Sequence, residues 1–222
     1  MTISKPLATY FEHTILKPDT THEEVERVCR EALHYHFAGV CVPPYFLEQA
    51  ADLLQDSEVE LVTVIGFPYG YNSTMSKFEE VEDAMQNGAL HLDVVINIAA
   101  VKNQDWDHVE TELATLTKLA HSEDRLIKVI AESGMMSEVE LDLIIRIANE
   151  VGIDYLKTST GMNGIGASIE AVEQMRKGLD PSIRIKASGG IRTREAALEL
   201  IRAGANRIGA SASVAIMQEG AN

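Results

Sequence analysis

The chain has 222 residues, of which 45% are hydrophobic, and this length and composition suit one globular domain over residues 1–222. Its formal net charge of −15 argues against nucleic-acid and anionic membrane partners, because both bind clustered lysine and arginine. No uncharged apolar stretch reaches the roughly 18 residues that a membrane helix needs.

Short runs rich in valine, isoleucine and leucine alternate along the chain with longer amphipathic segments. This alternation is typical of βα units on a parallel sheet. The predicted strands cover residues 10–16, 38–42, 60–66, 91–97, 126–132, 154–158, 182–188 and 207–210.

Helical spacing of apolar residues predicts the longer segments between these strands. The clearest helices cover residues 21–35, 76–87, 105–121, 137–151 and 193–203, and four of them are followed by a glycine or another small residue. Thr21 can cap the first helix, with Glu24 three residues on as its capping-box partner. Eight strands with intervening helices predict an α/β fold, a single (β/α)8 TIM barrel. A doubly wound open sheet is the main alternative.

Charged residues interrupt several predicted strands. Barrel strands are buried on both faces, so a charge there is costly unless it is paired or used in chemistry. A salt-bridge network accounts for any one such residue, but three lysines with two or three acids form an expensive arrangement for stability alone. We therefore expect a functional cluster near the barrel axis. Its members are Glu12, Asp93, Lys128, Lys157 and Lys186, with Glu132 at the end of the fifth strand.

Lysine chemistry indicates what this cluster can do. An amine attacks a carbonyl only when neutral, so a catalytic lysine needs a lowered pKa. Lys157 and Lys186 lie on adjacent predicted strands, where one cation can keep the other amine neutral. A neutral Lys157 can form a Schiff base with an aldehyde, and Asp93 can move protons through water or with Lys186. This is class I aldolase chemistry, which uses no metal and no cofactor.

Glycine and hydroxyl residues are concentrated after the last three predicted strands, at 158–164, 187–192 and 209–213. Glycine lets the backbone approach a ligand, and phosphate sites recur after strands seven and eight of barrels. One such loop alone fits an ordinary turn, but three together favour a phosphate monoester site. Arg192 or Arg207 can add positive charge, and the sequence does not decide between them.

Six segments resemble the deoxyribose-phosphate aldolase family, occur in the family's order and span nearly the whole chain. They are VIGFPYG (64–70), HLDVVIN (91–97), IKVIAES (127–133), LKTSTG (156–161), KASGGIR (186–192) and RIGAS (207–211). The resemblance implies a (β/α)8 barrel lyase. Such an enzyme reversibly cleaves 2-deoxy-D-ribose 5-phosphate to D-glyceraldehyde 3-phosphate and acetaldehyde, in deoxynucleoside breakdown.

The resemblance also implies roles for individual residues. Lys157 matches the Schiff-base lysine, and Asp93 and Lys186 match its proton-transfer partners. The phosphate site would be lined by Gly161, Gly189, Gly190, Gly209 and Ser211. We expect supporting roles for Glu12, Thr14, Lys128 and Thr158.

Some positions depart from the family pattern. Glu12 stands where the family usually has an aspartate, and Met162 stands where some members have a lysine. Ala212 replaces a second serine, so the phosphate would be held more by backbone. Residues 219–222 lack the terminal tyrosine that some members use near the site.

We expect a cytoplasmic enzyme with small aldehyde and sugar-phosphate substrates, assembled as a homo-oligomer such as a dimer. The only cysteines, Cys29 and Cys41, suit reduced thiols, and the first residues lack a signal-peptide pattern. Cys41 is expected to be mainly a buried thiol.

Two other functions stay open at this point. One is a different sugar-phosphate barrel enzyme, such as an isomerase, an epimerase or a transaldolase-like enzyme, which need not keep both lysines. The other is a noncatalytic sugar-phosphate binding protein. The presence of Asp93, Lys157 and Lys186 together argues against this last function.

Overall fold

Eight parallel strands form a closed barrel in the computed structural model, which describes residues 5–219. Each strand pairs with the next, and the last pairs with the first. The missing terminal tyrosine concerns residues 220–222, which lie outside the described part. The strands are β1 (Phe11–Thr14), β2 (Gly39–Cys41), β3 (Glu60–Ile65), β4 (His91–Val95), β5 (Leu126–Ile130), β6 (Tyr155–Lys157), β7 (Arg184–Ser188) and β8 (Arg207–Ala210). The predicted (β/α)8 barrel is confirmed, and the open sheet is wrong.

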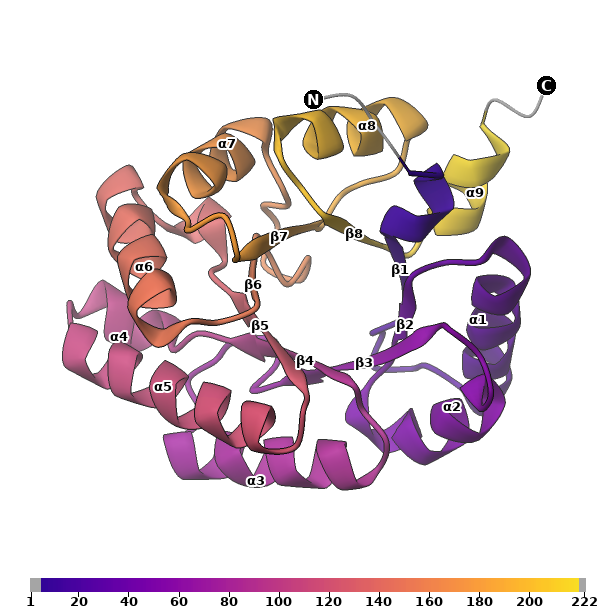
Figure 1. Ribbon diagram of the computed structural model, residues 1–222, viewed down its shortest axis with the longest axis horizontal. Helices are drawn as coiled ribbons and strands as arrows, with labels where there is room; N and C mark the ends of the chain where they lie inside the picture. Colours follow the sequence, from indigo (N-terminus) through magenta and orange to yellow (C-terminus); the bar gives the residue numbers. More distant parts are fainter. Residues whose placement is uncertain (1–4, 220–222) are drawn as a thin grey trace.

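Helices surround the barrel on its outer side (Figure 1). The longer ones are α1 (His22–Tyr35), α2 (Leu47–Leu54), α3 (Thr74–Gln86), α5 (Trp106–Ser122), α6 (Glu138–Val151), α7 (Ile169–Gly178) and α8 (Arg194–Ala203). Short segments are α4 (Ile98–Lys102), α9 (Ser213–Gln218) and the 3-10 turns η1 (Leu7–Tyr10), η2 (Pro44–Phe46) and η3 (Ser133–Met135).

Local sequence signals account for several helix boundaries. The predicted capping box is present at α1, where the Thr21 side chain accepts from the Glu24 backbone and Glu24 accepts from the Thr21 backbone. Gly152 ends α6 in the left-handed conformation, as predicted for a glycine there. At α1, however, the left-handed residue is His36, and Gly39 already belongs to β2. A Cβ atom at Gly39 would lie 2.7 Å from the carbonyl oxygen of Glu60, so glycine is needed there for strand packing.

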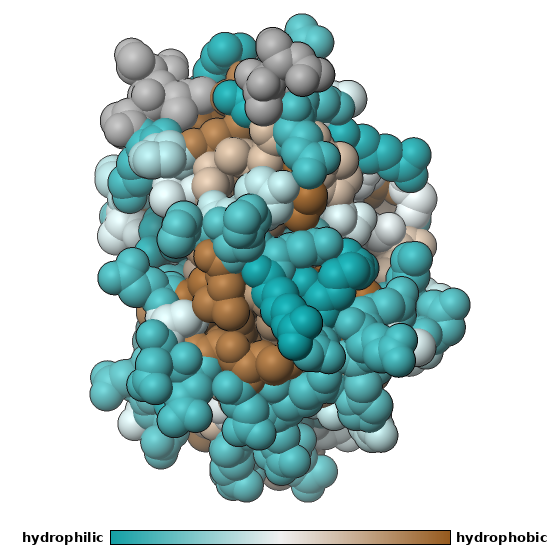
Figure 2. Space-filling model, turned by 90° about the vertical axis from the view of Figure 1, so that its right-hand side faces the viewer, coloured by the Kyte–Doolittle hydropathy of each residue, from teal (hydrophilic) through white to brown (hydrophobic). Residues whose placement is uncertain are grey.

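The hydrophobic core lies between the strands and the inner faces of the helices, where buried valine, leucine and isoleucine side chains exclude water. Sequence patterning did not mark α2, α4 and α7. In α7 only Val172 and Met175 are buried, so its apolar stripe is too sparse to stand out. On the side of the molecule that carries α1 and α9, hydrophilic residues cover most of the surface around a band of hydrophobic ones (Figure 2). Among residues 5–219, no helix is long and apolar enough to cross a membrane.

Candidate active site

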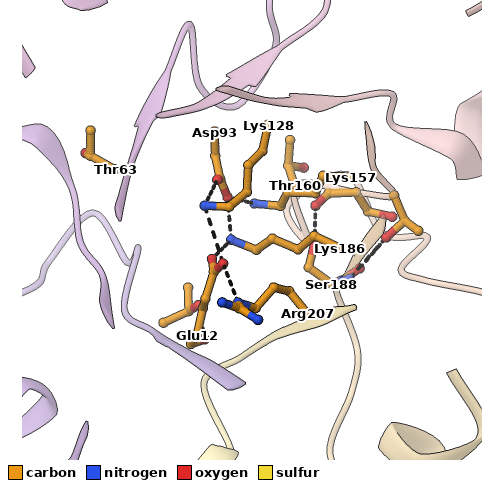
Figure 3. A network of polar contacts seen from close by, with 12 residues as sticks. Glu12, Thr63, Asp93, Lys128, Lys157, Thr160, Lys186, Ser188 and Arg207 are labelled. Carbon is orange, nitrogen blue, oxygen red and sulfur yellow. Dashed lines mark hydrogen bonds and ion pairs between the residues drawn. The ribbon is translucent and has the colours of Figure 1, made fainter. Parts of the chain in front are cut away.

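Three lysines and two acids meet inside the barrel (Figure 3). Each comes from a different strand, and none has a side chain more than 3% exposed. In the strand register, Lys157 lies opposite Lys186, and Asp93 lies opposite Lys128. The strand positions that looked anomalous in the sequence therefore face one another across the barrel interior. The cluster consists of Glu12, Asp93, Lys128, Lys157 and Lys186.

Asp93 holds the two lysines of β6 and β7 together. The Nζ atom of Lys157 donates to Oδ2 of Asp93 at 2.7 Å, and Nζ of Lys186 donates to the same oxygen at 2.6 Å. The other oxygen, Oδ1, lies 3.2 Å from Nζ of Lys128. One buried carboxylate thus faces three amines, and two of them share a single acceptor atom.

Glu12 forms the second anionic centre of the cluster. Lys186 donates to its Oε2 atom, and Nζ of Lys128 lies 3.3 Å from Oε1. Glu12 lies between two glycines of the neighbouring strands, Gly39 and Gly209. A Cβ atom at Gly209 would lie 3.0 Å from Cε of Lys186, so the glycine leaves the room that this lysine occupies. Glu12 thereby holds Lys186 from the side away from Lys157.

These surroundings move the pKa values of the two lysines in opposite directions. Burial lowers the pKa of Lys157, and the opposing effect of Asp93 is offset in part by the Lys186 cation. Burial also acts against the charged form of Lys186, but Asp93 and Glu12 outweigh it and raise its pKa. Lys157 is therefore the amine that becomes neutral more readily, while Lys186 stays an ammonium.

Both acids stay ionised in this environment. Burial would raise their pKa values, but the lysines outweigh it. The pKa of Asp93 is well below its usual value, and that of Glu12 is lowered to about 2. The cluster therefore holds charges of both signs, with one amine poised to lose its proton.

A pocket of about 250 Å³ opens over Lys157 at the carboxyl ends of the strands. Lys157 is the last residue of β6, and Thr14, the last residue of β1, also lines this pocket. All the residues that we predicted for phosphate binding line it as well; they are Gly161, Gly189, Gly190, Gly209 and Ser211. Of the two arginines that the sequence left open, Arg192 lines this pocket, whereas Arg207 begins β8 and lies at the other end of the barrel.

Glu132 anchors the loop after β6, the first of the three loops that we predicted to bind phosphate. Its carboxylate accepts from the Thr160 hydroxyl at 2.5 Å and from the Asn163 side chain at 2.9 Å. Glu132 is fully buried, and its backbone has the left-handed conformation, with a φ of 50°. Glu132 thus lies outside the lysine cluster, and it fixes the loop that carries Gly161.

The second loop is tied to the first one through β6 and β7. Thr158 is fully buried, and its hydroxyl donates to the Ser188 carbonyl and accepts from the Ser188 backbone. Gly189 follows with a φ of 91°, and a Cβ atom there would lie 2.9 Å from the Cα atom of Gly166. Thr158 therefore positions the loops without reaching the pocket, and Gly189 makes their close approach possible.

Of the five cluster residues only Lys157 lines the pocket. Asp93 and Lys186 contact Lys157 or its partner from behind, and Glu12 and Lys128 contact those two residues in turn. Sequence reasoning missed Leu16, Lys17 and Thr160 as lining residues. Lys17 carried a usable signal, because a charged residue directly after a predicted barrel strand belongs at the mouth. Of the departures, Met162 lines the pocket and Ala212 does not.

Two further features lie next to the cluster, one predicted and one seen only in the structure. Cys41 is fully buried and its pKa is raised to about 11 by burial, so it is the buried thiol that we expected. Glu12, Glu60 and His91 offer ligand atoms within 4.8 Å of one another. Arg207 already pairs with both carboxylates, at 3.8 Å from Glu12 and 3.3 Å from Glu60. Because these acids have a cation as partner, we assign no metal to them, and a metal-free mechanism stays a prediction.

Comparisons with known proteins agree with the barrel fold. A family model described as DeoC/LacD family aldolase matches residues 7–219. The chain is 47% identical over 211 residues to a deoxyribose-phosphate aldolase of Streptococcus suis, over 95% of both chains. It is 44% identical over 216 residues to deoxyribose-phosphate aldolase 1 of Bacillus licheniformis, over 97% of this chain and 96% of that one. A deoxyribose phosphate aldolase from Aeropyrum pernix, described as having a unique tetrameric structure, has a TM-score of 0.90 and 32% identity, over 96% of this chain and 90% of that one.

Proposed function

The chain belongs to the DeoC/LacD family of aldolases, and on that premise we propose that Lys157 is its Schiff-base lysine. The reaction is the reversible cleavage of 2-deoxy-D-ribose 5-phosphate to D-glyceraldehyde 3-phosphate and acetaldehyde, as the names of its relatives suggest. It serves the breakdown of deoxynucleosides. The observation that carries the residue assignment is the shared Asp93 oxygen, which holds a cationic Lys186 next to Lys157, the cluster residue that lines the pocket.

The first half of the reaction forms a covalent bond to Lys157. The neutral amine attacks the C1 aldehyde of the open-chain sugar, and the resulting carbinolamine loses water to give a protonated imine. This step needs a proton for the departing hydroxide. Lys186 is the acid that the geometry offers, and Asp93 passes the proton because both amines bind its Oδ2 atom.

The second half breaks the bond between C2 and C3. A base removes the proton of the C3 hydroxyl, the electron pair of the C2–C3 bond moves to the imine, and glyceraldehyde 3-phosphate leaves. The enamine then takes up a proton at C2, and water releases acetaldehyde and the free Lys157 amine. Asp93 with Lys186 exchanges these protons, either directly or through water.

The glycine loops bind the phosphate of the substrate. Gly189, Gly190 and Ser211 line the pocket from the β7 and β8 loops, and Arg192 adds a cation there. Small residues let backbone N–H groups and hydroxyls approach the phosphate oxygens. Met162 contributes no charge at its position, so we propose that Arg192 and Lys17 balance the phosphate in this chain.

Borohydride trapping tests the assignment of Lys157. The protein is incubated with acetaldehyde, reduced with borohydride and digested, and the modified peptide is identified by mass spectrometry. We expect an adduct on Lys157, and its absence in Lys157→Leu. Lys17 is the matched control, because it is another lysine in the wall of the same pocket. An adduct on Lys17 in active wild-type protein, with Lys157 unmodified, would contradict the mechanism.

Two further parts of the proposal concern assembly and location. We propose a homo-oligomer, with a dimer as its smallest form. Tyr69 and Tyr71 stack on each other at 5.5 Å and are 50% and 66% exposed, and Met75, four residues on in the chain, is 66% exposed. Exposed apolar side chains of this kind suit contact with another copy. Sedimentation equilibrium tests the assembly. Both cysteines are free and buried, which supports a cytoplasmic location.

A further inference from the structure

A second large cavity lies at the opposite end of the barrel from the catalytic pocket. Its volume is about 940 Å³. Tyr155, Arg184 and Arg207 each begin a strand and line it, together with residues from the ends of α7 and α8. Because parallel strands all enter the barrel at one end, this cavity is separated from the Lys157 pocket by the length of the strands.

The wall of this cavity is strongly basic. Aspartate and glutamate outnumber lysine and arginine by 34 to 19 in the chain, yet no acidic residue is among the described residues that line the cavity. We call it the basic pocket, defined by its six cationic residues. They are Lys5, Arg176, Lys177, Arg184, Arg202 and Arg207.

Ordinary structural roles account for only some of these cations. Arg176 donates to the backbone carbonyls of residues 179, 180 and 183, and so closes the turn after α7. Lys177 and Arg202 lie in the last turns of α7 and α8, where cations stabilise helix ends. Arg184 has none of these roles, because it begins β7 and, among residues 5–219, its side chain forms no hydrogen bond or ion pair; its guanidinium lies 4.1 Å from the centre of the Tyr155 ring.

Two buried donors at the base of the pocket form no hydrogen bond in the described part of the chain. Tyr155 is fully buried, and its hydroxyl has no hydrogen-bond partner in the described part of the chain. Burial raises the pKa of Tyr155, so the hydroxyl keeps its proton and can donate. The Nε atom of Arg207 also has no hydrogen-bond partner there, although this arginine pairs with Glu60 through Nη2. Nε of Arg207 does lie 3.8 Å from Glu12, so the Tyr155 hydroxyl is the donor without any partner. A buried donor without an acceptor is costly, and an oxygen-rich anion would satisfy it.

We propose that the basic pocket binds a small polyanion that carries two or more phosphate groups. The planar forks of Arg184 and Arg207 suit phosphate oxygens, and Lys177 and Arg202 add charge at the rim. The volume suits a metabolite of this class. A nucleic-acid strand does not fit this feature, because the positive charge lies in one cavity of an acidic protein. This site is separate from the phosphate loops over Lys157.

Arg207 also links the basic pocket to the catalytic cluster (Figure 3). Its Nε atom lies 3.8 Å from Oε1 of Glu12, and Glu12 accepts from Lys186. A polyanion on Arg207 would therefore lie two contacts from a lysine of the active site. For this reason the test measures binding directly, and it includes a variant of the catalytic pocket.

Isothermal titration of the full-length protein with pyrophosphate, at about 0.15 M salt, tests the proposal. The wild type should bind with a Kd below roughly 1 mM. Lys177→Gln/Arg202→Gln should raise the Kd roughly tenfold or more, because both residues are exposed cations at the rim. Tyr155→Phe, which removes only the unpartnered hydroxyl, should raise it several-fold. Arg192→Gln, in the catalytic pocket, should leave the basic-pocket Kd unchanged.

The variants separate binding from folding. Thermal unfolding of each one is measured beside the titration, and the exposed Lys177→Gln/Arg202→Gln pair keeps the test valid if Tyr155→Phe is unstable. The absence of pyrophosphate binding by the wild type would overturn the proposal. Binding that is weakened by Arg192→Gln and unaffected by the basic-pocket variants would overturn it as well, because the catalytic phosphate site would then account for it.

Discussion

Lys157 and Lys186 lie opposite each other on β6 and β7 and donate to the same oxygen of Asp93. Two ammonium groups that bind one acceptor repel each other, so the loss of one proton removes this repulsion. Asp93 and Glu12 stabilise the cation on Lys186, which leaves Lys157 as the amine that deprotonates. In the proposed mechanism, the relative position of these two lysines is thus the source of the nucleophile.

Replacement of Lys186 tests this relationship. Lys186→Leu removes the neighbouring cation, so the pKa of Lys157 should rise and less of this amine should be neutral near pH 7. Turnover should fall roughly a hundredfold or more, because a proton donor is lost too. The measurement is kcat/KM as a function of pH, whose acidic limb should move to higher pH. Lys118→Leu, on the exposed surface of α5, is the control. If Lys186→Leu leaves the dependence of kcat/KM on pH unchanged, Lys186 has no part in the mechanism.

The two acids of the cluster should make stability depend on pH. In the folded state the pKa of Glu12 is lowered to about 2 and that of Asp93 is also lowered. A lowered folded pKa contributes stability above the unfolded pKa, and this contribution is lost as the pH falls toward the folded pKa. The free energy of unfolding should therefore decrease steeply between about pH 5 and pH 2. Urea unfolding over this range measures it.

Glu12→Gln identifies the source of that pH dependence. It should lower the free energy of unfolding at neutral pH by on the order of 3 kcal/mol and flatten its decrease in acid. Glu170→Gln, on the exposed first turn of α7, is the matched control and should change neither quantity. Parallel curves for wild type and Glu12→Gln would show that other carboxylates cause the acid sensitivity.

Arg192 distinguishes phosphate binding from catalysis. Arg192→Gln removes a cation from the pocket over the glycine loops, so KM for 2-deoxyribose 5-phosphate should rise roughly tenfold or more. Steady-state kinetics with unphosphorylated 2-deoxyribose should give nearly the same kcat/KM as the wild type, because that sugar has no phosphate to lose. Arg146→Gln on the α6 surface is the control. Equal losses with both sugars would mean that Arg192 acts on the reacting end of the substrate.

A buried ion pair outside the active site should matter for stability alone. Nζ of Lys77 donates to Glu112 at 2.7 Å and to the carbonyl of Val95 at 2.8 Å, and both charged side chains are fully buried. Lys77→Met leaves an unpaired buried carboxylate and should cost about 3–5 kcal/mol of unfolding free energy. Lys77→Met/Glu112→Leu should recover most of that loss in chemical denaturation. A double variant no more stable than the single one would contradict this account, and KM should not change in either.

The sequence by itself determined the fold class and most of the candidate pocket. Alternation of strand and helix patterns predicted a (β/α)8 barrel, which the structure confirms. Charges inside barrel strands pointed to Lys157, Lys186 and Asp93, because a charge is too costly there without a partner or a task. These signals are local, since they depend on residue type and spacing.

Contacts between distant segments depended on tertiary structure. Arg192 lines the pocket over Lys157, whereas Arg207 lines the cavity at the opposite end of the barrel. The sequence did not separate them, because Arg192 follows β7 and Arg207 begins the next strand, β8. The partners of Glu132 and the Lys77–Glu112 pair were also hidden, because each joins elements that are far apart in the chain. The basic pocket also depends on tertiary structure, because its cations come from separate parts of the chain. They lie before η1 and in α7, β7, α8 and β8. Strand order and register decide which side chains meet, and no periodicity along one segment records that.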